Sequence, residues 1–318
     1  MNIGIYGTGV FGLALSSIFT DNGCNITMWT KFKDEKDELI KNKGSKMLPN
    51  YNIGDNITIT NSLDEVAKDK DLLVIAIPVA FIEDTLKNAN IKDGANILVA
   101  SKGITNDKLL VSELIGKYVN ANVAVLSGPT FASDVVLKKP ISFTIATLDE
   151  NLKRICMLAF KNNYVKLQYS NDLYAIEFLG AIKNVYAIIS GLLDGLGATK
   201  STKALFLTDA IRDEEAILES LDCLRDDALS YAGVGDLILT CSSSDSRNYS
   251  FGKILGESGI SASKDFLKNN TVEGYQTISN IAELVIYDKI NSKLLKCLVN
   301  ILNGVSSKED IFNVLVTN

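Results

Sequence analysis

The sequence predicts an α/β fold, with a doubly wound, mostly parallel sheet at the N-terminal end and an all-helical domain after it. Two observations predict this fold class. In the first half of the 318 residues, short β-branched runs alternate with polar stretches of helical spacing. Beyond about residue 170, apolar residues recur mainly at helical spacing. We therefore expect two domains, residues 1–170 and residues 171–318.

The expected elements follow in chain order. Six apolar runs predict strands at residues 2–6, 25–29, 72–77, 95–100, 123–126 and 141–146. Helical patterns lie between the strands at residues 13–21, 63–68 and 107–119. In the second half they lie at residues 174–193, 203–224, 278–287 and 291–302. Residues 31–50 are rich in Lys, Asp, Glu and Asn, so we expect them to be exposed.

The composition excludes several classes of site. The chain has no histidine, which excludes Ser-His-Asp hydrolases, His-based hydroxyacid dehydrogenases and nearly all His-ligated metal sites. We therefore expect no metal, and acid–base chemistry near neutral pH must use Lys, Asp, Glu, Tyr or Cys. The five cysteines are scattered, with no Cys-x-x-Cys pair, and are expected to be free, buried thiols.

The net charge of −6 argues against a nucleic-acid partner but allows a small anionic substrate. The chain begins directly with a predicted strand, without a basic leader. Its strongest apolar run, Leu72 to Ile82, is interrupted by Pro78 and is shorter than the ~18–20 residues of a membrane span. We expect a cytoplasmic protein with no membrane span.

A glycine-rich loop, Gly7-Thr8-Gly9-Val10-Phe11-Gly12, joins the first predicted strand to the first helix. Glycine permits the tight turn at Gly7, a close approach of a pyrophosphate at Gly9 and close strand–helix packing at Gly12. The helix N-terminus adds free N–H groups for the anion. The loop predicts a Rossmann-type domain that binds NAD or NADP.

The choice between NAD and NADP stays open. NAD-selective sites often carry Asp or Glu near the end of the second strand, about 20 residues beyond the loop. Here that strand is followed by Thr30-Lys31-Phe32-Lys33. Lys31 could neutralise a 2′-phosphate, which favours NADP, or it could be a solvated surface cation.

An isolated cation, Lys183, lies in a long apolar helical stretch beside Asn184. Burial would lower its pKa, and a carboxylate such as Asp236 would raise it again. Lysine in that setting suits acid–base chemistry on a carbonyl or alcohol, although a snorkelling lysine is the alternative. Arg247-Asn248 likewise suits binding of a phosphate or forms an ordinary surface loop.

Together these motifs resemble the NAD(P)-dependent glycerol-3-phosphate dehydrogenases over nearly the whole chain. The matching blocks are residues 7–12, 101–103, 127–132, 180–185, 233–241, 246–248 and 272–274. The resemblance implies reversible reduction of dihydroxyacetone phosphate to sn-glycerol 3-phosphate, within glycerophospholipid metabolism. It implies a phosphorylated small-molecule substrate bound between the two domains, and it allows a homodimer.

The resemblance also implies the roles of individual residues. Lys183 would donate the proton, and Lys102 and Asp236 would orient and polarise the substrate. The substrate-binding residues would be those three with Gly128, Thr130, Asn184, Thr240, Ser246, Arg247 and Asn248. The cofactor-binding residues would be Gly7, Gly9, Val10, Phe11, Gly12, Lys31, Phe81, Lys102, Ala132, Arg247 and Glu273.

Two alternatives remain at this point. One is another two-domain hydroxyacid or sugar-nucleotide dehydrogenase, against which the Ser246-Arg247-Asn248 motif argues because it suits a phosphate. The other is a nucleotide-sensing protein without turnover, against which Lys102, Lys183 and Asp236 argue.

Overall fold

The computed structural model describes residues 1–286 and 289–317, which fall into two compact units. The first unit comprises residues 1–101 and 109–173, and the second comprises residues 102–108 and the described residues from 174 onward. The first contains a mostly parallel sheet and the second is helical, so the predicted fold class is confirmed. Residues 102–108 group with the helical unit although they precede it in the sequence.

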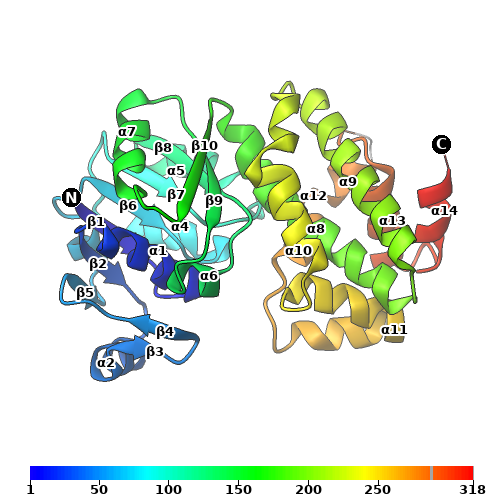
Figure 1. Ribbon diagram of the computed structural model, residues 1–318. Coiled ribbons are helices and arrows are strands. Elements are labelled where there is room, and N and C mark those ends of the chain that lie inside the picture. Colours follow the sequence, from blue (N-terminus) through cyan, green and yellow to red (C-terminus); the bar gives the residue numbers. More distant parts are fainter. Residues whose placement is uncertain (287–288, 318) are drawn as a thin grey trace. The chain divides into compact units, whose positions relative to one another are not determined.

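The first unit is built on an eight-stranded sheet with the order β10-β9-β8-β7-β6-β1-β2-β5 (Figure 1). Paired strands run parallel, except that β8 and β9 are antiparallel. The chain starts at β1 in the interior of the sheet, adds β2 and β5 on one side, and then crosses to β6 on the other. This doubly wound order places a switch point beside β1, where ligands bind in such sheets.

The strands of this sheet are β1 (Asn2–Tyr6), β2 (Asn25–Trp29), β5 (Ile57–Thr60), β6 (Leu72–Ile75), β7 (Asn96–Val99), β8 (Asn122–Ser127), β9 (Ile141–Ala146) and β10 (Val165–Ser170). A separate antiparallel pair consists of β3 (Gly44–Ser45) and β4 (Leu48–Asn52). The helices of the unit are α1 (Val10–Asp21), α2 (Lys33–Asn42), α3 (Leu63–Ala67), η1 (Val79–Phe81), α4 (Ile82–Asn88), α5 (Val111–Tyr118), α6 (Ala132–Val136) and α7 (Glu150–Ala159).

The predicted strands at residues 2–6, 25–29 and 141–146 coincide with β1, β2 and β9. The sequence reasoning missed β5 and β10. In β10, exposed Lys166 interrupts half-buried residues, because this strand lies at the edge of the sheet and lacks the continuous apolar run of a central strand. Residues 31–50 are mostly exposed as expected, but Leu39 and Leu48 are buried in α2 and β4.

The second unit consists of helices in its described part: α8 (Leu173–Gly195), α9 (Lys200–Ser220), η2 (Arg225–Leu229), η3 (Tyr231–Gly235), α10 (Asp236–Ser242), α11 (Arg247–Leu267), α12 (Glu273–Ile286), α13 (Lys293–Leu302) and α14 (Asp310–Val316). The last residue of the helix predicted at 278–287 lies outside the described residues. By length and composition α8 could cross a membrane, yet its apolar window is wholly buried within the protein. That burial is typical of a core helix.

Helices α8 and α11 pack backbone against backbone. A Cβ atom built on Gly252 of α11 would lie 1.9 Å from the carbonyl oxygen of Ile188, and one built on Gly191 of α8 would lie 2.0 Å from the carbonyl oxygen of Tyr249. Gly195 and Gly256 repeat the close contact one turn further on. Small residues spaced by four therefore let the two helices approach closely.

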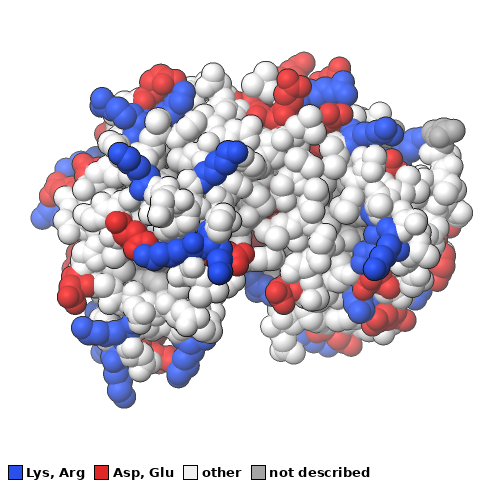
Figure 2. All heavy atoms as spheres, viewed as in Figure 1, with Lys and Arg blue, Asp and Glu red and all other residues white. Residues whose placement is uncertain are grey.

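Charged side chains of both signs are scattered over the face of the molecule seen in Figure 2. Described surface ion pairs such as Lys46–Glu38 and Lys87–Glu83 contribute to this mixture. Exposed pairs of this kind stabilise a fold by about 0–1 kcal/mol each, so the surface charge is mainly a matter of solubility.

Candidate active site

The glycine loop lies between β1 and α1 and requires its glycines. Gly7 has φ of +121°, and a Cβ there would lie 2.5 Å from the carbonyl oxygen of Ala76. A Cβ on Gly12 would lie 2.5 Å from the Gly7 oxygen. Beside Gly9 the space is open, since a Cβ would meet no protein atom within 4 Å.

This open space belongs to a cavity of about 340 Å³ in the first unit. The cavity is lined by Gly7, Thr8, Gly9, Trp29, Thr30, Lys31, Phe32, Glu35, Ala76, Ile77, Pro78, Phe81, Asp84 and Thr85. At the start of α1, Gly9 makes no side-chain cap, so the first-turn N–H groups remain available to an anion. The glycines, the helix start and the exposed aromatic rings of Phe32 and Phe81 fit the pyrophosphate and bases of a dinucleotide.

Of the expected cofactor residues in the first unit, Gly7, Gly9, Lys31 and Phe81 line this cavity, whereas Val10, Phe11, Gly12 and Ala132 do not. The ring of Phe11 packs edge-to-face on Phe143, with centroids 6.4 Å apart, and belongs to the core packing. Ala132 begins α6 and also packs against the core of the first unit.

A carboxylate that the sequence reasoning missed lies close to the end of β2. The hydroxyl of buried Thr30 donates to the carboxylate of Glu35 in the first turn of α2. Glu35 lies within a run of charged residues that suggested a solvated surface. The sequence signal for it is weak: an acidic residue follows Thr30 by five positions.

The expected substrate residues Gly128 and Thr130 of the first unit are held against β9. The Thr130 hydroxyl donates to the Ser142 carbonyl oxygen at 3.0 Å, and a Cβ on Gly128 would lie 2.5 Å from the same oxygen. Glycine is therefore required there by close backbone approach.

In the second unit, Lys183, Lys102 and Asp236 form a buried charge cluster. Lys183 donates to one carboxylate oxygen of Asp236 and Lys102 donates to the other. Lys183 is 7% exposed and Asp236 is 1% exposed. Lys102 is only partly buried, so the Asp236 carboxylate compensates one buried and one partly buried ammonium group.

The fold positions each member of this cluster. Lys183 lies midway along α8, and Asp236 is the first residue of α10, directly after the π-helical turn η3. Within η3, Gly233 has non-helical dihedrals, and a Cβ there would lie 2.2 Å from the Ala228 oxygen. Such π-turns often occur at functional sites.

Thr240 completes the polar contacts of Lys183. Its hydroxyl accepts from the Lys183 ammonium at 3.0 Å and donates to the backbone oxygen of Asp236 at 2.7 Å. Because Thr240 follows Asp236 by one turn of α10, a single helix supplies both partners.

The pKa values in the cluster follow from burial and mutual charge. Burial lowers the pKa of Lys183 to about 8, although Asp236 acts in the opposite direction. Burial by itself would raise the pKa of Asp236, but Lys102 and Lys183 together bring that pKa below its ordinary value. A lysine with such a pKa, next to a carboxylate that stays ionised, can exchange a proton near neutral pH.

A polar network adjoins this cluster through Asn184. Its side-chain oxygen accepts from the Asn248 amide at 3.0 Å, and its own amide donates to Glu273 at 3.4 Å. The oxygen of Asn248 accepts from the Gly274 N–H at 2.8 Å. An amide nitrogen has two N–H donors, and among the described residues the Asn248 amide donates to Asn184 alone, so its second donor can bind a ligand.

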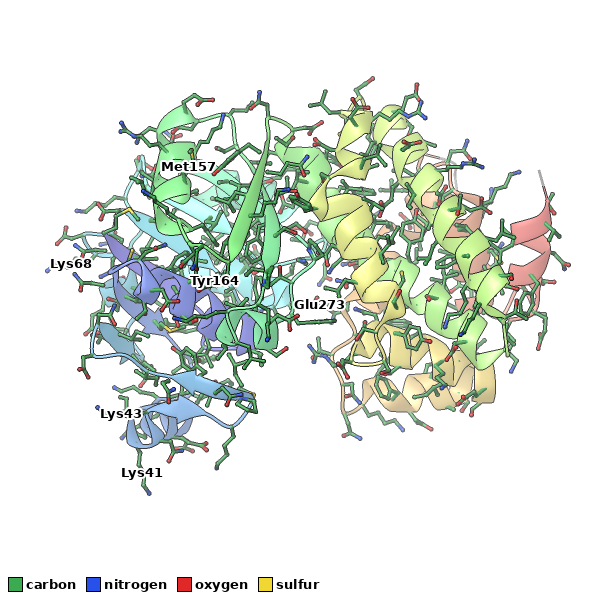
Figure 3. All side chains as sticks on the ribbon, viewed as in Figure 1. Lys41, Lys43, Lys68, Met157, Tyr164 and Glu273 are labelled. Atoms are coloured by element: carbon green, nitrogen blue, oxygen red, sulfur yellow. The ribbon has the colours of Figure 1, made fainter. Side chains whose placement is uncertain are left out.

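Arg247 lies at the start of α11, and Glu273, which is labelled in Figure 3, lies at the start of α12. Arg247 is exposed, and burial raises the pKa of Glu273 while the Arg247 charge opposes that shift. Ser246 caps α11, its hydroxyl accepting from the Tyr249 N–H at 3.3 Å. The structure therefore brings Asn184, Asn248 and Glu273 into one network.

A second buried carboxyl near the lysine cluster was not expected. Glu214 of α9 is 1% exposed and neither carboxyl oxygen has a hydrogen-bond partner among the described residues. Burial raises its pKa well above the ordinary value. The sequence does contain a sign of this burial, because helical spacing places Glu214 on the same face of α9 as the buried residues Phe206, Ala210 and Ile217.

Comparison with known proteins places these features in context. Residues 2–153 match the family model for the N-terminus of NAD-dependent glycerol-3-phosphate dehydrogenase, and residues 172–313 match the model for its C-terminus. A glycerol-3-phosphate dehydrogenase [NAD(P)+] of Alcanivorax borkumensis is 33% identical over 93% of this chain and 89% of its own. The enzyme of that name from Staphylococcus carnosus is 30% identical over 94% and 93%.

Among solved structures, glycerol-3-phosphate dehydrogenase from Coxiella burnetii superposes with a TM-score of 0.90 at 22% identity, covering 100% of this chain and 99% of that one. This likeness shows a shared fold.

Proposed function

Because the chain belongs to the NAD-dependent glycerol-3-phosphate dehydrogenase family, we propose that it reversibly reduces dihydroxyacetone phosphate to sn-glycerol 3-phosphate. The observation that carries the proposal is the buried Lys102–Asp236–Lys183 cluster, in a chain without histidine. We propose residues 1–170 as the dinucleotide-binding domain and residues 171–318 as the substrate domain, acting in the cytoplasm and assembled as a homodimer.

The cofactor supplies the hydride when it is bound, and the residues supply proton transfer and charge stabilisation. During reduction Lys183 donates a proton to the carbonyl oxygen and becomes a neutral amine. Its low pKa supports this role, because less free energy is needed to release the proton. In the reverse direction the neutral amine accepts the alcohol proton.

Asp236 and Lys102 act on Lys183 and on the substrate oxygen. The carboxylate fixes the Lys183 ammonium in place. Lys102 adds a positive charge that stabilises the oxyanion as it develops. Thr240 and Asn184 line this part of the site and restrict the orientation of the substrate.

Ser246, Arg247 and Asn248 would bind the phosphate group. The exposed guanidinium of Arg247 offers a planar fork of donors, and the free donor of Asn248 adds a further hydrogen bond. Gly128 and Thr130 would contact the substrate from the first domain. The remaining cofactor contacts that we propose are those of Gly7, Gly9, Val10, Phe11, Gly12, Lys31, Phe81, Lys102, Ala132, Arg247 and Glu273.

The test is a steady-state assay of dihydroxyacetone phosphate reduction with NADH and with NADPH. Replacing Lys183→Ala should lower kcat by about 10²–10⁴-fold, because a general acid contributes on that order. Lys264→Ala, which removes an exposed lysine of α11, is the matched control and should leave kcat unchanged.

A substrate panel checks the specificity of the proposal. A non-phosphorylated hydroxyacid ranked above glycerol 3-phosphate would refute the phosphate-binding role. Retention of most turnover by the Lys183→Ala variant would refute the acid–base assignment.

A further inference from the structure

The cavity in the first unit has a negatively charged side chain in its wall, and a hydrogen bond holds that side chain in place. Glu35 lines the cavity beside residues 29–32 and is half-buried. Its carboxylate accepts from the hydroxyl of Thr30, which is 3% exposed, and that hydroxyl in turn accepts from the Phe32 N–H at 3.3 Å. The backbone, a buried hydroxyl and the carboxylate thus form a chain that fixes the charge at the cavity wall.

Of the described residues that line this cavity, the charged ones are Lys31, Glu35 and Asp84. Lys31 and Asp84 are exposed, so water and salt screen their charges strongly. Glu35 is less exposed than either and is held in one orientation by Thr30. Its charge should therefore act on a ligand more strongly than theirs.

The other lysines of this region do not compensate Glu35 within the cavity. Lys33, Lys36 and Lys41 of α2 are not among its lining residues. Lys41 projects outward from the helix, as its label in Figure 3 shows.

We propose that Glu35, oriented by Thr30, is the residue that makes this site prefer NAD(H) to NADP(H). The inference rests on the proposed function, in which this cavity holds the dinucleotide. The glycine loop at one end suits the pyrophosphate, and the end of β2 lies where the adenosine ribose binds in doubly wound folds.

The chemistry discriminates between the two cofactors. An ionised carboxylate accepts hydrogen bonds from the ribose hydroxyls of NAD(H). A 2′-phosphate presents a second anion at the same point, and like charges a few ångströms apart repel strongly at a partly buried site. The prediction is opposite to the preference for NADP that Lys31 suggests from sequence alone. The reason is that Glu35, five residues after Thr30, folds back onto the strand end.

Direct binding tests the proposal without turnover. NADH and NADPH are titrated separately into the full chain and followed by nicotinamide fluorescence, for the natural protein and for Glu35→Gln. The natural protein should bind NADH more tightly by on the order of tenfold to a hundredfold. Glu35→Gln should lose most of that ratio, mainly because NADPH binds more tightly.

Three further variants test whether the position of the charge, rather than the total charge of α2, sets the ratio. Asp37→Asn removes an exposed carboxylate from the same helix and should keep the natural ratio. Thr30→Val removes the anchoring hydroxyl but leaves Glu35, and should give an intermediate ratio, whereas Thr30→Ser should restore it. Thermal unfolding of each variant checks that it folds.

The outcomes distinguish this inference from the proposed function. If both dinucleotides bind and Glu35→Gln keeps the natural ratio, or if the natural protein prefers NADPH, the role of Glu35 is refuted and the proposed function stands. If neither dinucleotide binds, the proposed function fails and this inference fails with it.

Discussion

The replacement Asp236→Asn tests whether one carboxylate compensates the buried ammonium group of Lys183 and the partly buried one of Lys102. The side chains have nearly the same size, so the change removes charge without creating a cavity. Both Lys183 and Lys102 lose their ionic partner. The oxygen of the new Asn side chain can still accept a hydrogen bond from one of them. Because Asp236 is 1% exposed and Lys183 is 7% exposed, water replaces little of what is lost.

The expected loss of stability is about 3 kcal/mol. Removing one partner of a buried ion pair typically costs about 3–5 kcal/mol. Lys183 can reduce that cost by releasing its proton, because burial already lowers its pKa to about 8 with Asp236 present, and loss of that carboxylate lowers the pKa further. The loss should therefore fall near the lower end and should shrink above pH 8, where Lys183 of the natural protein is itself neutral.

Urea unfolding with two probes provides the assay. Far-UV circular dichroism follows mainly the helical second unit, whereas fluorescence follows the single tryptophan, Trp29, in the first unit. The Asp236→Asn replacement should lower the circular dichroism midpoint. Combined with Lys102→Met it should cost less than the sum of the two single changes, by at least about 1 kcal/mol.

The reasoning is refuted if Asp236→Asn unfolds at the same urea concentration as the natural protein. It is also refuted if the two changes add within about 0.3 kcal/mol, because independent sites behave in that way.

Four further predictions concern pH and packing. The rate of dihydroxyacetone phosphate reduction should fall as pH rises through about 8, while the rate of glycerol 3-phosphate oxidation should rise, because the pKa of Lys183 is about 8; parallel profiles would contradict its role. The replacement Glu214→Met should raise the melting temperature, since it removes a buried carboxyl without partners at a gain of about 1–3 kcal/mol; a lower melting temperature would argue against this. Burial raises the pKa of Asp213 to about 6, so its contribution to stability is full below about pH 4 and is lost as pH rises through 6. Asp213→Asn should remove about 3 kcal/mol of that dependence, measured as unfolding midpoints from pH 4 to 7, and an unchanged slope would disprove it. Finally, Gly252→Ala should destabilise by about 1–3 kcal/mol in urea unfolding, because its Cβ would lie 1.9 Å from the Ile188 oxygen; an unchanged midpoint would show that the helices can separate freely.

The sequence was sufficient for the central sheet because its strands are buried on both faces. β1 and β6 appear as continuous apolar runs, and their position in the sequence follows directly from that burial. β5 and β10 are the two edge strands of this sheet and are partly exposed, so their patterns are weak. Local patterns predict an element well only where its environment is uniform.

The candidate site divides in the same way. An isolated cation in an apolar helix drew attention to Lys183, and the structure places Asp236 against it. Glu35 and Glu214 were missed because each lies within a run of charged residues, where sequence reasoning assumes solvent. Their burial depends on which face of α2 and of α9 packs against the rest of the protein, and composition does not reveal that orientation.

The close packing of α8 against α11 has a consequence for how the protein can evolve. Asn184 precedes Gly191 and Gly195 of α8, and Asn248 precedes Gly252 and Gly256 of α11, and the two side-chain amides form a hydrogen bond of 3.0 Å. Peptide groups, rather than side chains, set the spacing between these helices, and so between Lys183 and the residues proposed to hold the phosphate. Mutation of side chains can change which chemical groups of a substrate the site recognises at either end. It cannot easily change the distance between the ends, so selection for a longer or shorter substrate would have to remodel the backbone itself.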